Sequence, residues 1–365
     1  MSEADPAARI ILEDGTEFEG VSRAWHHSSA GEILVYTGET GLPALLTDPA
    51  LKGAILVLTR PVAGVTGIPD EENDTLALGT TVESAEVQIA GLVCSSLSLE
   101  SYHYRSKKTL ARWLKRHQIP VISGIDTSAL VRRINLRGNL RAKILVSQAP
   151  DISFSAAKTG EVALQSSVKR TIVYGTGPKR ILVIDCGARN SVIRSLVTPR
   201  TSVIRVPAAS DWSSLDCDGI VVAGGPGDPT TCEKAISILS QKLSLSIPIF
   251  ATGQGAVILG IAAGGAAYRM ARGHHSPSVP CVCLETGRCY LTAQNHGYGI
   301  RSDSLPSGWD PLFLNNADQS LEGFSTKKGL IKGVLFQPEG HPGPHETDFL
   351  WTEFVQLVDN GGPQA

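Results

Sequence analysis

The chain has 365 residues, enough for two domains with sizeable cores, and 42% of them are hydrophobic. A formal net charge of -2 excludes the strongly basic balance of a nucleic-acid-binding protein. Seven cysteines, an odd number at scattered positions, predict a reduced, cytoplasmic chain rather than a disulfide framework.

Two further features concern membranes and metals. The uncharged run 250–268 is long enough for a bilayer, but its five glycines, with Thr252 and Gln254, indicate a packed soluble interior. The first residues also lack the basic and apolar regions of an export signal. The cysteines of the segment 281–289 have no partner pair at zinc spacing. We therefore expect no membrane association and no metal site.

Residues 1–150 predict a β-rich α+β domain. Residues 9–12 and 17–20 flank an Asp-Gly turn, which is typical of a β-hairpin. Two more apolar runs, 32–36 and 54–58, are expected to be strands, with a short polar-capped segment between them.

Two helices are expected later in this domain. One runs over 106–117 with Ser106 as its N-cap, and the other starts at the N-cap Asp126 and ends near Ile134. A local basic patch consists of Arg132, Arg133, Arg137 and Arg141. It is either a solvated face or an interface with a partner.

A change of pattern separates the two halves of the chain. Residues 151–178 lose periodicity and are rich in Ser, Thr and Gly, so we expect a connector there. From 179 to 365 short apolar strands alternate with helices. The expected strands are 181–184, 202–206 and 219–223, and the expected helices are 189–197 and 233–243. This alternation predicts a parallel α/β sheet with helices on both faces.

The most informative stretch is 247–260. The apolar run 247–250 predicts a buried strand, small residues follow, and an apolar helix comes next. This is the outline of a strand–turn–helix elbow, in which the residues flanking the nucleophile must be small. Ala251 and Gly255 fit the small positions, which leaves Gly253 at the nucleophile position. Placing Thr252 there would instead require Phe250 and Gln254 to be small.

Ligand sites in such sheets lie at the carboxyl ends of the strands. Residues 224–229 follow a strand, and their glycines let backbone N–H groups approach an oxyanion. Residues 294–298 follow an expected strand over 289–292, and residues 334–340 are a third stretch of this kind.

Together these residues resemble the small, glutaminase subunit of carbamoyl-phosphate synthetase over nearly the whole chain. In the first half the matching segments are 40–41, 46–49, 102–105, 113–114 and 123–127. In the second half they are 225–229, 273–275, 294–297, 338–339 and 342–345. The first-half segments distinguish this family from other class I glutamine amidotransferases, and the resemblance implies a class I amidotransferase-like domain with a central, mostly parallel sheet.

The resemblance implies a mechanism and a partner. In the family, an elbow cysteine attacks the glutamine side-chain amide, a histidine activates the cysteine, and a glutamate orients the histidine. The ammonia passes to a large subunit, which uses bicarbonate and ATP with Mg²⁺ to make carbamoyl phosphate, a precursor of pyrimidines and arginine. The implied assembly is a heterodimer or higher oligomer, and we expect no cofactor in this chain.

The sequence departs from the family pattern where the chemistry occurs. Gly253 stands for the cysteine and Gln337 for the histidine, so Glu339 alone remains of the triad. Three pocket positions are also altered, namely Ala50, Gln254 and Val257. Five are retained, namely Gly225, Gly227, Asn295, Gly297 and Tyr298. Because intact triads contribute many powers of ten in rate, we predict that glutamine hydrolysis is lost.

Other side chains offer no replacement. Cys186 follows the first strand of the second domain, and we expect a buried structural thiol there. We expect structural hydrogen-bonding roles for His274, His275 and His296.

Two functions remain open. The chain is either a non-hydrolytic small subunit that supports ammonia-dependent synthesis by the large subunit, or a regulatory or scaffold pseudoenzyme that acts outside that complex. A new activity in the remodelled pocket is a third possibility, but no assembled acid, base and nucleophile supports it.

Overall fold

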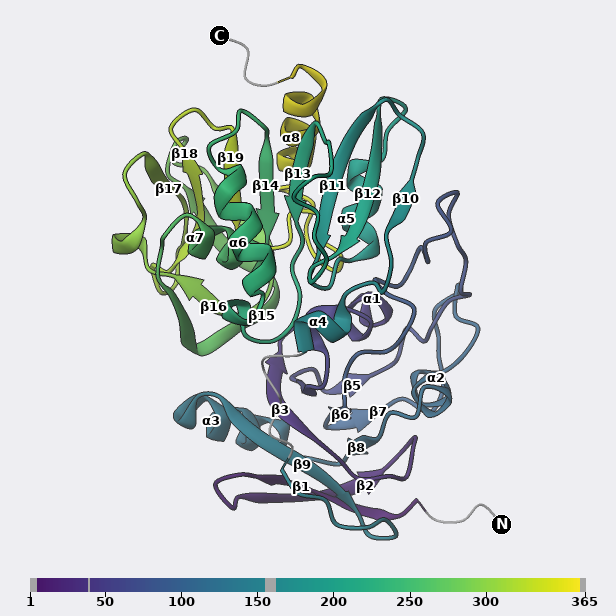
Figure 1. Ribbon diagram of the computed structural model, residues 1–365. Helices are drawn as coiled ribbons and strands as arrows, with labels where there is room; N and C mark the ends of the chain where they lie inside the picture. Colours follow the sequence, from purple (N-terminus) through teal and green to yellow (C-terminus); the bar gives the residue numbers. More distant parts are fainter. Residues whose placement is uncertain (1–4, 39, 155–161, 362–365) are drawn as a thin grey trace. The chain divides into compact units, whose positions relative to one another are not determined.

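The computed structural model describes residues 5–38, 40–154 and 162–361, and it divides into two compact units. The N-terminal unit consists of the described residues of Met1–Asp74, Gly79–Lys158 and Ala271–Ser276. The C-terminal unit contains the remaining described residues (Figure 1). Each unit is built around its own hydrophobic clusters.

The N-terminal unit is organised by a closed β-barrel with the strand order β1-β2-β8-β6-β4-β3-β9. Its strands are β1 (Ala7–Leu12), β2 (Glu17–Ser22), β3 (Ser29–Tyr36), β4 (Ile55–Leu58), β6 (Gly91–Val93), β8 (Val121–Ser123) and β9 (Leu140–Val146). A separate parallel pair consists of β5 (Val62–Ala63) and β7 (Ser96–Leu97). The antiparallel β1–β2 pairing confirms the predicted hairpin.

Short helices cover this barrel. They are α1 (Leu42–Leu46), the 3₁₀ turn η1 (Pro49–Leu51), α2 (Leu110–Arg116) and α3 (Thr127–Arg137). Asp126 caps α3 as predicted, since its carboxylate accepts the N–H of Ala129 at 2.9 Å. The predicted cap of α2 was wrong, because Thr109 caps that helix. Lys108 pairs with Ile68 in a β-bridge, which keeps the residues before Thr109 out of the helix.

The basic patch on α3 and β9 is largely neutralised by the turn of the first hairpin. Arg133 lies 2.7 Å from the carboxylate of Asp14, and Arg137 lies 3.8 Å from it. Arg141 pairs with Glu13 at 2.9 Å. These ion pairs favour the solvated-face interpretation of the patch.

The C-terminal unit contains a ten-stranded sheet with the order β10-β12-β11-β13-β14-β19-β18-β17-β15-β16 (Figure 1). Its strands are β10 (Ile172–Tyr174), β11 (Lys179–Asp185), β12 (Thr201–Pro207), β13 (Gly219–Val222), β14 (Ile249–Thr252), β15 (Ala267–Cys283), β16 (Cys289–Ile300), β17 (Trp309–Asn315), β18 (Leu321–Thr326) and β19 (Ile331–Val334). The strands from β12 to β19 in this order pair in parallel, as predicted.

Helices cover both faces of the parallel part. They are α4 (Val162–Ser166), α5 (Asn190–Leu196), α6 (Glu233–Lys242), α7 (Gln254–Ala262) and α8 (Phe349–Asp359), with 3₁₀ turns η2 (Pro229–Thr231) and η3 (Ser302–Ser304). Alternate strand residues enter different clusters. Ile249 and Ala251 pack with α6 and α7, whereas Phe250 packs with α5 and α8. This alternation follows from the two-residue period of a strand and gives three layers.

Two sequence expectations need correction. The segment 151–178 is more than a connector, because its described part includes α4 and the edge strand β10. Residues 294–298 lie within β16 rather than after a strand, since β16 continues to Ile300. Gly297 in that stretch hid the strand pattern from the sequence. No helix among the described residues has the length and hydropathy needed to span a bilayer.

Candidate functional site

The elbow forms where it was predicted. Strand β14 ends at Thr252, and α7 begins at Gln254. Gly253 joins them with φ 55° and ψ -130°, a conformation that L side chains rarely adopt. Its N–H donates to the carbonyl of Val334 at 2.9 Å, which ties the turn to the neighbouring strand β19. The backbone of a nucleophile elbow is therefore present without a nucleophilic side chain.

Close backbone packing explains the neighbouring glycines. A Cβ atom on Gly255 would lie 2.1 Å from the carbonyl oxygen of Val222, so the start of α7 packs directly on β13. A Cβ on Gly225 would lie 1.9 Å from the carbonyl oxygen of Cys186. A Cβ on Gly253, by contrast, would meet only the Cα of Gly224, at 3.6 Å. The site therefore has space for a side chain at the nucleophile position, and the sequence does not supply one.

Gln254 bridges the elbow and the glycine-rich turn after β13. Its Nε2 donates to the carbonyl oxygen of Gly227 at 3.1 Å, and the side chain is 5% exposed. Its Oε1 has no hydrogen-bond partner among the described residues. An amide is neither a nucleophile nor a base near neutral pH, so this contact holds two loops together and supplies no chemistry.

Gln337 lies close to the elbow in the fold. Strand β19 ends at Val334, the residue bonded to Gly253, and Gln337 follows three residues later. The N–H of Gln337 donates to the carbonyl of Ala293 on β16 at 2.8 Å. The structure thus places the two altered triad positions just after the carboxyl ends of the adjacent strands β14 and β19. The residue at the base position carries a neutral amide.

Glu339 is buried and engaged on both carboxylate oxygens. Arg189 Nη1 donates to its Oε1 at 2.7 Å, and the indole Nε1–H of Trp351 donates to its Oε2 at 3.2 Å. The side chains of Arg189 and Glu339 are 6% and 5% exposed. The remaining triad acid therefore takes part in a buried ion pair that links α5, α8 and the segment after β19.

The sequence interpretation missed both partners of Glu339. The sequence pattern predicts only the start of a helix at Arg189, and it gives no signal at Trp351. One usable signal was present: Arg189 follows a strand of the parallel sheet, and side chains there reach the edge where Glu339 was expected. A buried carboxylate at that edge requires a cationic or hydrogen-bonding partner.

The other predicted pocket positions lie in three different elements. Asn295, Gly297 and Tyr298 lie on β16, which packs beside α7. Val257 does not line an open site, because it is fully buried in the hydrophobic cluster between α7 and the sheet. Ala50 lies in η1 of the N-terminal unit.

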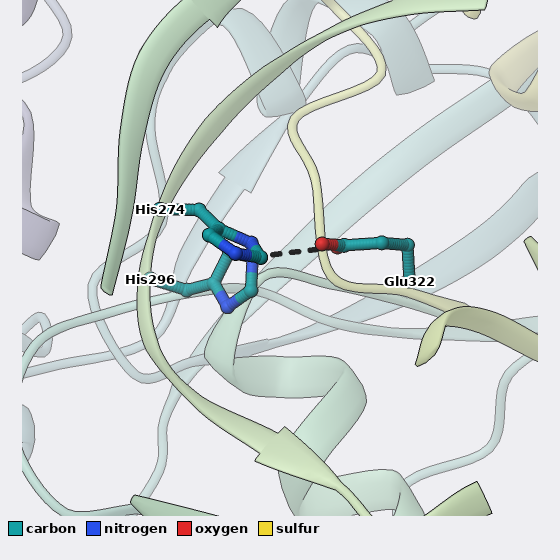
Figure 2. A group of neighbouring side chains, drawn as sticks. All are labelled: His274, His296 and Glu322. Atoms are coloured by element: carbon teal, nitrogen blue, oxygen red, sulfur yellow. Dashed lines mark ion pairs between the residues drawn. The ribbon is translucent and has the colours of Figure 1, made fainter. Parts of the chain in front are cut away.

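A buried polar network lies beside these β16 residues. The ring of His296 contacts the Tyr298 carbonyl through Nδ1 at 2.9 Å and Gln294 Oε1 through Nε2 at 2.6 Å. Its Nε2 also lies 3.4 Å from the carboxylate of Glu322 (Figure 2). Asn315 donates to the other oxygen of Glu322 at 3.1 Å. His296 thus has the structural hydrogen bonds that were expected of it. His274, also labelled in Figure 2, belongs to the N-terminal unit.

Cys186 does not replace the missing nucleophile. It is fully buried in the core at the end of β11. A hydrogen bond to Cys232, together with burial, raises the pKa of the Cys186 thiol well above its ordinary value. A protonated, solvent-inaccessible thiol is inert as a nucleophile.

Comparisons with known proteins agree with this architecture. Residues 10–144 match the family model described as carbamoyl-phosphate synthase small chain, CPSase domain, and residues 182–357 match glutamine amidotransferase class-I. The human carbamoyl-phosphate synthase [ammonia], mitochondrial, is 36% identical over 358 residues, which cover 97% of this chain and 24% of that protein. The multifunctional protein ura1 of Schizosaccharomyces pombe is 33% identical over 383 residues, covering 96% of this chain and 17% of that protein. The chain therefore spans a quarter or less of the length of these relatives.

Proposed function

The chain belongs to the carbamoyl-phosphate synthase small-chain family, and from this premise we propose that it supports ammonia-dependent carbamoyl phosphate synthesis without hydrolysing glutamine. The single observation behind this proposal is Gly253, a residue without a side chain on a formed nucleophile elbow. A thioester intermediate requires a thiol at that point, and glycine offers only hydrogen atoms.

The rest of the site supports the same proposal. The amide of Gln337 cannot accept a proton from a nucleophile near neutral pH. The carboxylate of Glu339 pairs with Arg189 and Trp351. Each of the three triad positions thus lacks its chemical role, and loss of the nucleophile and base leaves only background catalysis.

The proposed role in synthesis depends on a partner. Carbamoyl phosphate formation would occur on a large subunit that binds ATP, Mg²⁺ and bicarbonate, with free ammonia as the nitrogen source. One of the relatives is named for ammonia, which is consistent with this nitrogen source. The chain would keep the large subunit in its active form.

The test compares nitrogen sources. Carbamoyl phosphate is measured with the cognate large subunit, with and without this chain, supplied with either glutamine or ammonium. We expect the chain to raise the ammonium-dependent rate and glutamine to give no product. Glutamate release from glutamine would refute the loss of hydrolysis. If the chain changes neither rate and does not co-purify with the large subunit, it is instead a regulatory or scaffold pseudoenzyme.

A further inference from the structure

The exposed large hydrophobic side chains of the described residues are unevenly distributed. Five of eleven lie on two adjacent segments of the N-terminal unit, and we call these five the tyrosine patch. They are Val62 (45% exposed), Val65 (42%), Leu99 (67%), Tyr102 (75%) and Tyr104 (87%). Single exposed apolar residues are ordinary, whereas a cluster of this kind marks an interaction site.

The two segments, residues 62–68 and 96–108, lie side by side. Strands β5 and β7 pair in parallel, the N–H of Ser98 donates to the carbonyl of Ala63, and the N–H of Tyr102 donates to that of Val65. A further bridge joins Ile68 to Lys108. The patch residues are therefore presented by one continuous surface rather than by separate loops.

The surface is firmly supported from below. Ala63, Ile68 and Leu97, which alternate with the patch residues along the two segments, are buried in the hydrophobic cluster beneath α2. At the tip, the Ser106 hydroxyl donates to that of Ser101 at 2.7 Å, and the Ser106 N–H donates to the carbonyl of His103. Because the backbone is held in place, a partner would lose little conformational entropy from this side on binding.

The polar groups of the patch are also available. The phenol hydroxyls of Tyr102 and Tyr104 and the guanidinium of Arg105 make no hydrogen bond or ion pair with other described residues. Tyrosine and arginine are among the residue types most enriched at the energetic centres of protein interfaces. Such a surface fits a protein that offers an apolar groove with a carboxylate for Arg105.

We infer that the tyrosine patch, with Arg105, is the surface through which this chain binds its synthetase partner chain. This inference rests on the proposed function. The length of the relatives indicates the occupant. At least three-quarters of each relative lies outside the part that this chain matches. Under the proposed function, a partner equivalent to that remainder must contact this chain for the chain to affect ammonia-dependent synthesis. The partner surface is apolar and carries an acidic group.

The test measures binding of the full chain to the cognate large subunit by biolayer interferometry. The Tyr102→Ser/Tyr104→Ser double variant should bind at least about 30-fold more weakly, since the two most exposed aromatic side chains of the patch are removed. Arg105→Glu should also weaken binding, and the loss of affinity relative to the wild type should be larger at low salt than at high salt. The matched control is Leu136→Ser, a side chain that is 79% exposed on α3 outside the patch, and it should bind like the wild type.

The outcomes separate the two proposals. If the wild type binds and the patch variants bind equally well, the patch inference fails and the proposed function stands. If the wild type does not bind at all, the proposed function fails together with the inference. Sedimentation of the chain alone gives a third readout: a dimer that the double variant abolishes would assign the patch to a second copy of this chain and overturn the inference. Thermal unfolding checks that each variant is folded.

Discussion

The elbow at Gly253 and the segment from Gln337 to Glu339 have departed from an amidotransferase site in different ways. At the elbow the backbone is complete and the reactive side chain is missing. In the segment after β19 the acid is still present, but it is bound to Arg189 and Trp351. One region has kept geometry without chemistry, and the other has kept a residue type in a structural role.

The difference shows which constraints are structural. Gly255 is required by packing, because the start of α7 lies directly against the backbone of β13. That requirement persists whether or not a thiol is present. A buried carboxylate likewise persists once it has a cationic partner, since removing either member leaves a desolvated group. Retention of a site residue is therefore weak support for retained catalysis.

The largest expected effect is on catalysis. Gly253→Cys alone should hydrolyse glutamine no faster than the wild type, because the thiol would lack a base. Gly253→Cys combined with Gln337→His should exceed the single variant by about 10²–10⁴-fold, the usual contribution of a general base. Glutamate release measures both rates. Turnover by the single variant would show that another group already acts as the base.

The second-largest effect is expected on stability, at the buried Arg189–Glu339 ion pair. Arg189→Met should lower the free energy of unfolding by about 3–5 kcal/mol, because it leaves the Glu339 carboxylate buried without its cation. Urea denaturation at pH 7 measures this change. Arg9→Met is the control, since the Arg9–Glu17 pair is 51% and 43% exposed and should contribute less than about 1 kcal/mol. Equal effects of the two substitutions would mean that Glu339 is not held by Arg189.

The elbow glycines should differ from each other. Gly255→Ala places a Cβ against the Val222 carbonyl and should destabilise the fold by about 3 kcal/mol. Gly253→Ala has space but strained backbone angles, so we expect about 1–3 kcal/mol. Gly297→Ala, with no atom within 4 Å of its Cβ and no positive φ, is the control and should stay within about 0.5 kcal/mol. If Gly253→Ala behaves like the control, the elbow does not require glycine.

The smallest expected effect is in the chemical labelling of the cysteine thiols. This labelling tests whether a thiol has replaced the lost nucleophile. Burial raises the pKa of Cys94 and of Cys281 to about 12. At pH 8 about 10⁻⁴ of each is therefore thiolate, so iodoacetamide should label exposed Cys289 and leave these two unmodified. Mass spectrometry after brief treatment measures this.

The same shifts predict a pH dependence of stability. The unfolded chain loses these thiol protons near the ordinary value of 9.0, whereas the folded chain holds them to about 12. The stabilisation is therefore fully present below pH 9 and is lost as the pH rises from about 9 to 12. The unfolding midpoint should be lower at pH 10 than at pH 8. A midpoint that does not fall would contradict the raised pKa values of Cys94 and Cys281.

The sequence alone determined a large part of this protein. Steric rules placed the elbow at Gly253 because only that register has small residues on both sides, and the structure has the turn there. Apolar runs of four or five residues identified the central strands, since strands buried on both faces carry continuous apolar sequence. Local signals of this kind depend on neighbours in the chain and can be read directly.

Only the tertiary structure decided what the remaining site residues do. Glu339 and its partner Arg189 are 150 residues apart, and no local pattern connects them. The strand over residues 294–298 was hidden by Gly297, and the cap of α2 is Thr109 because Lys108 pairs with a distant segment. The tyrosine patch likewise joins two segments that are separated in the sequence. In each case the deciding energy comes from burial, hydrogen bonds or ion pairs between residues that only the fold brings together.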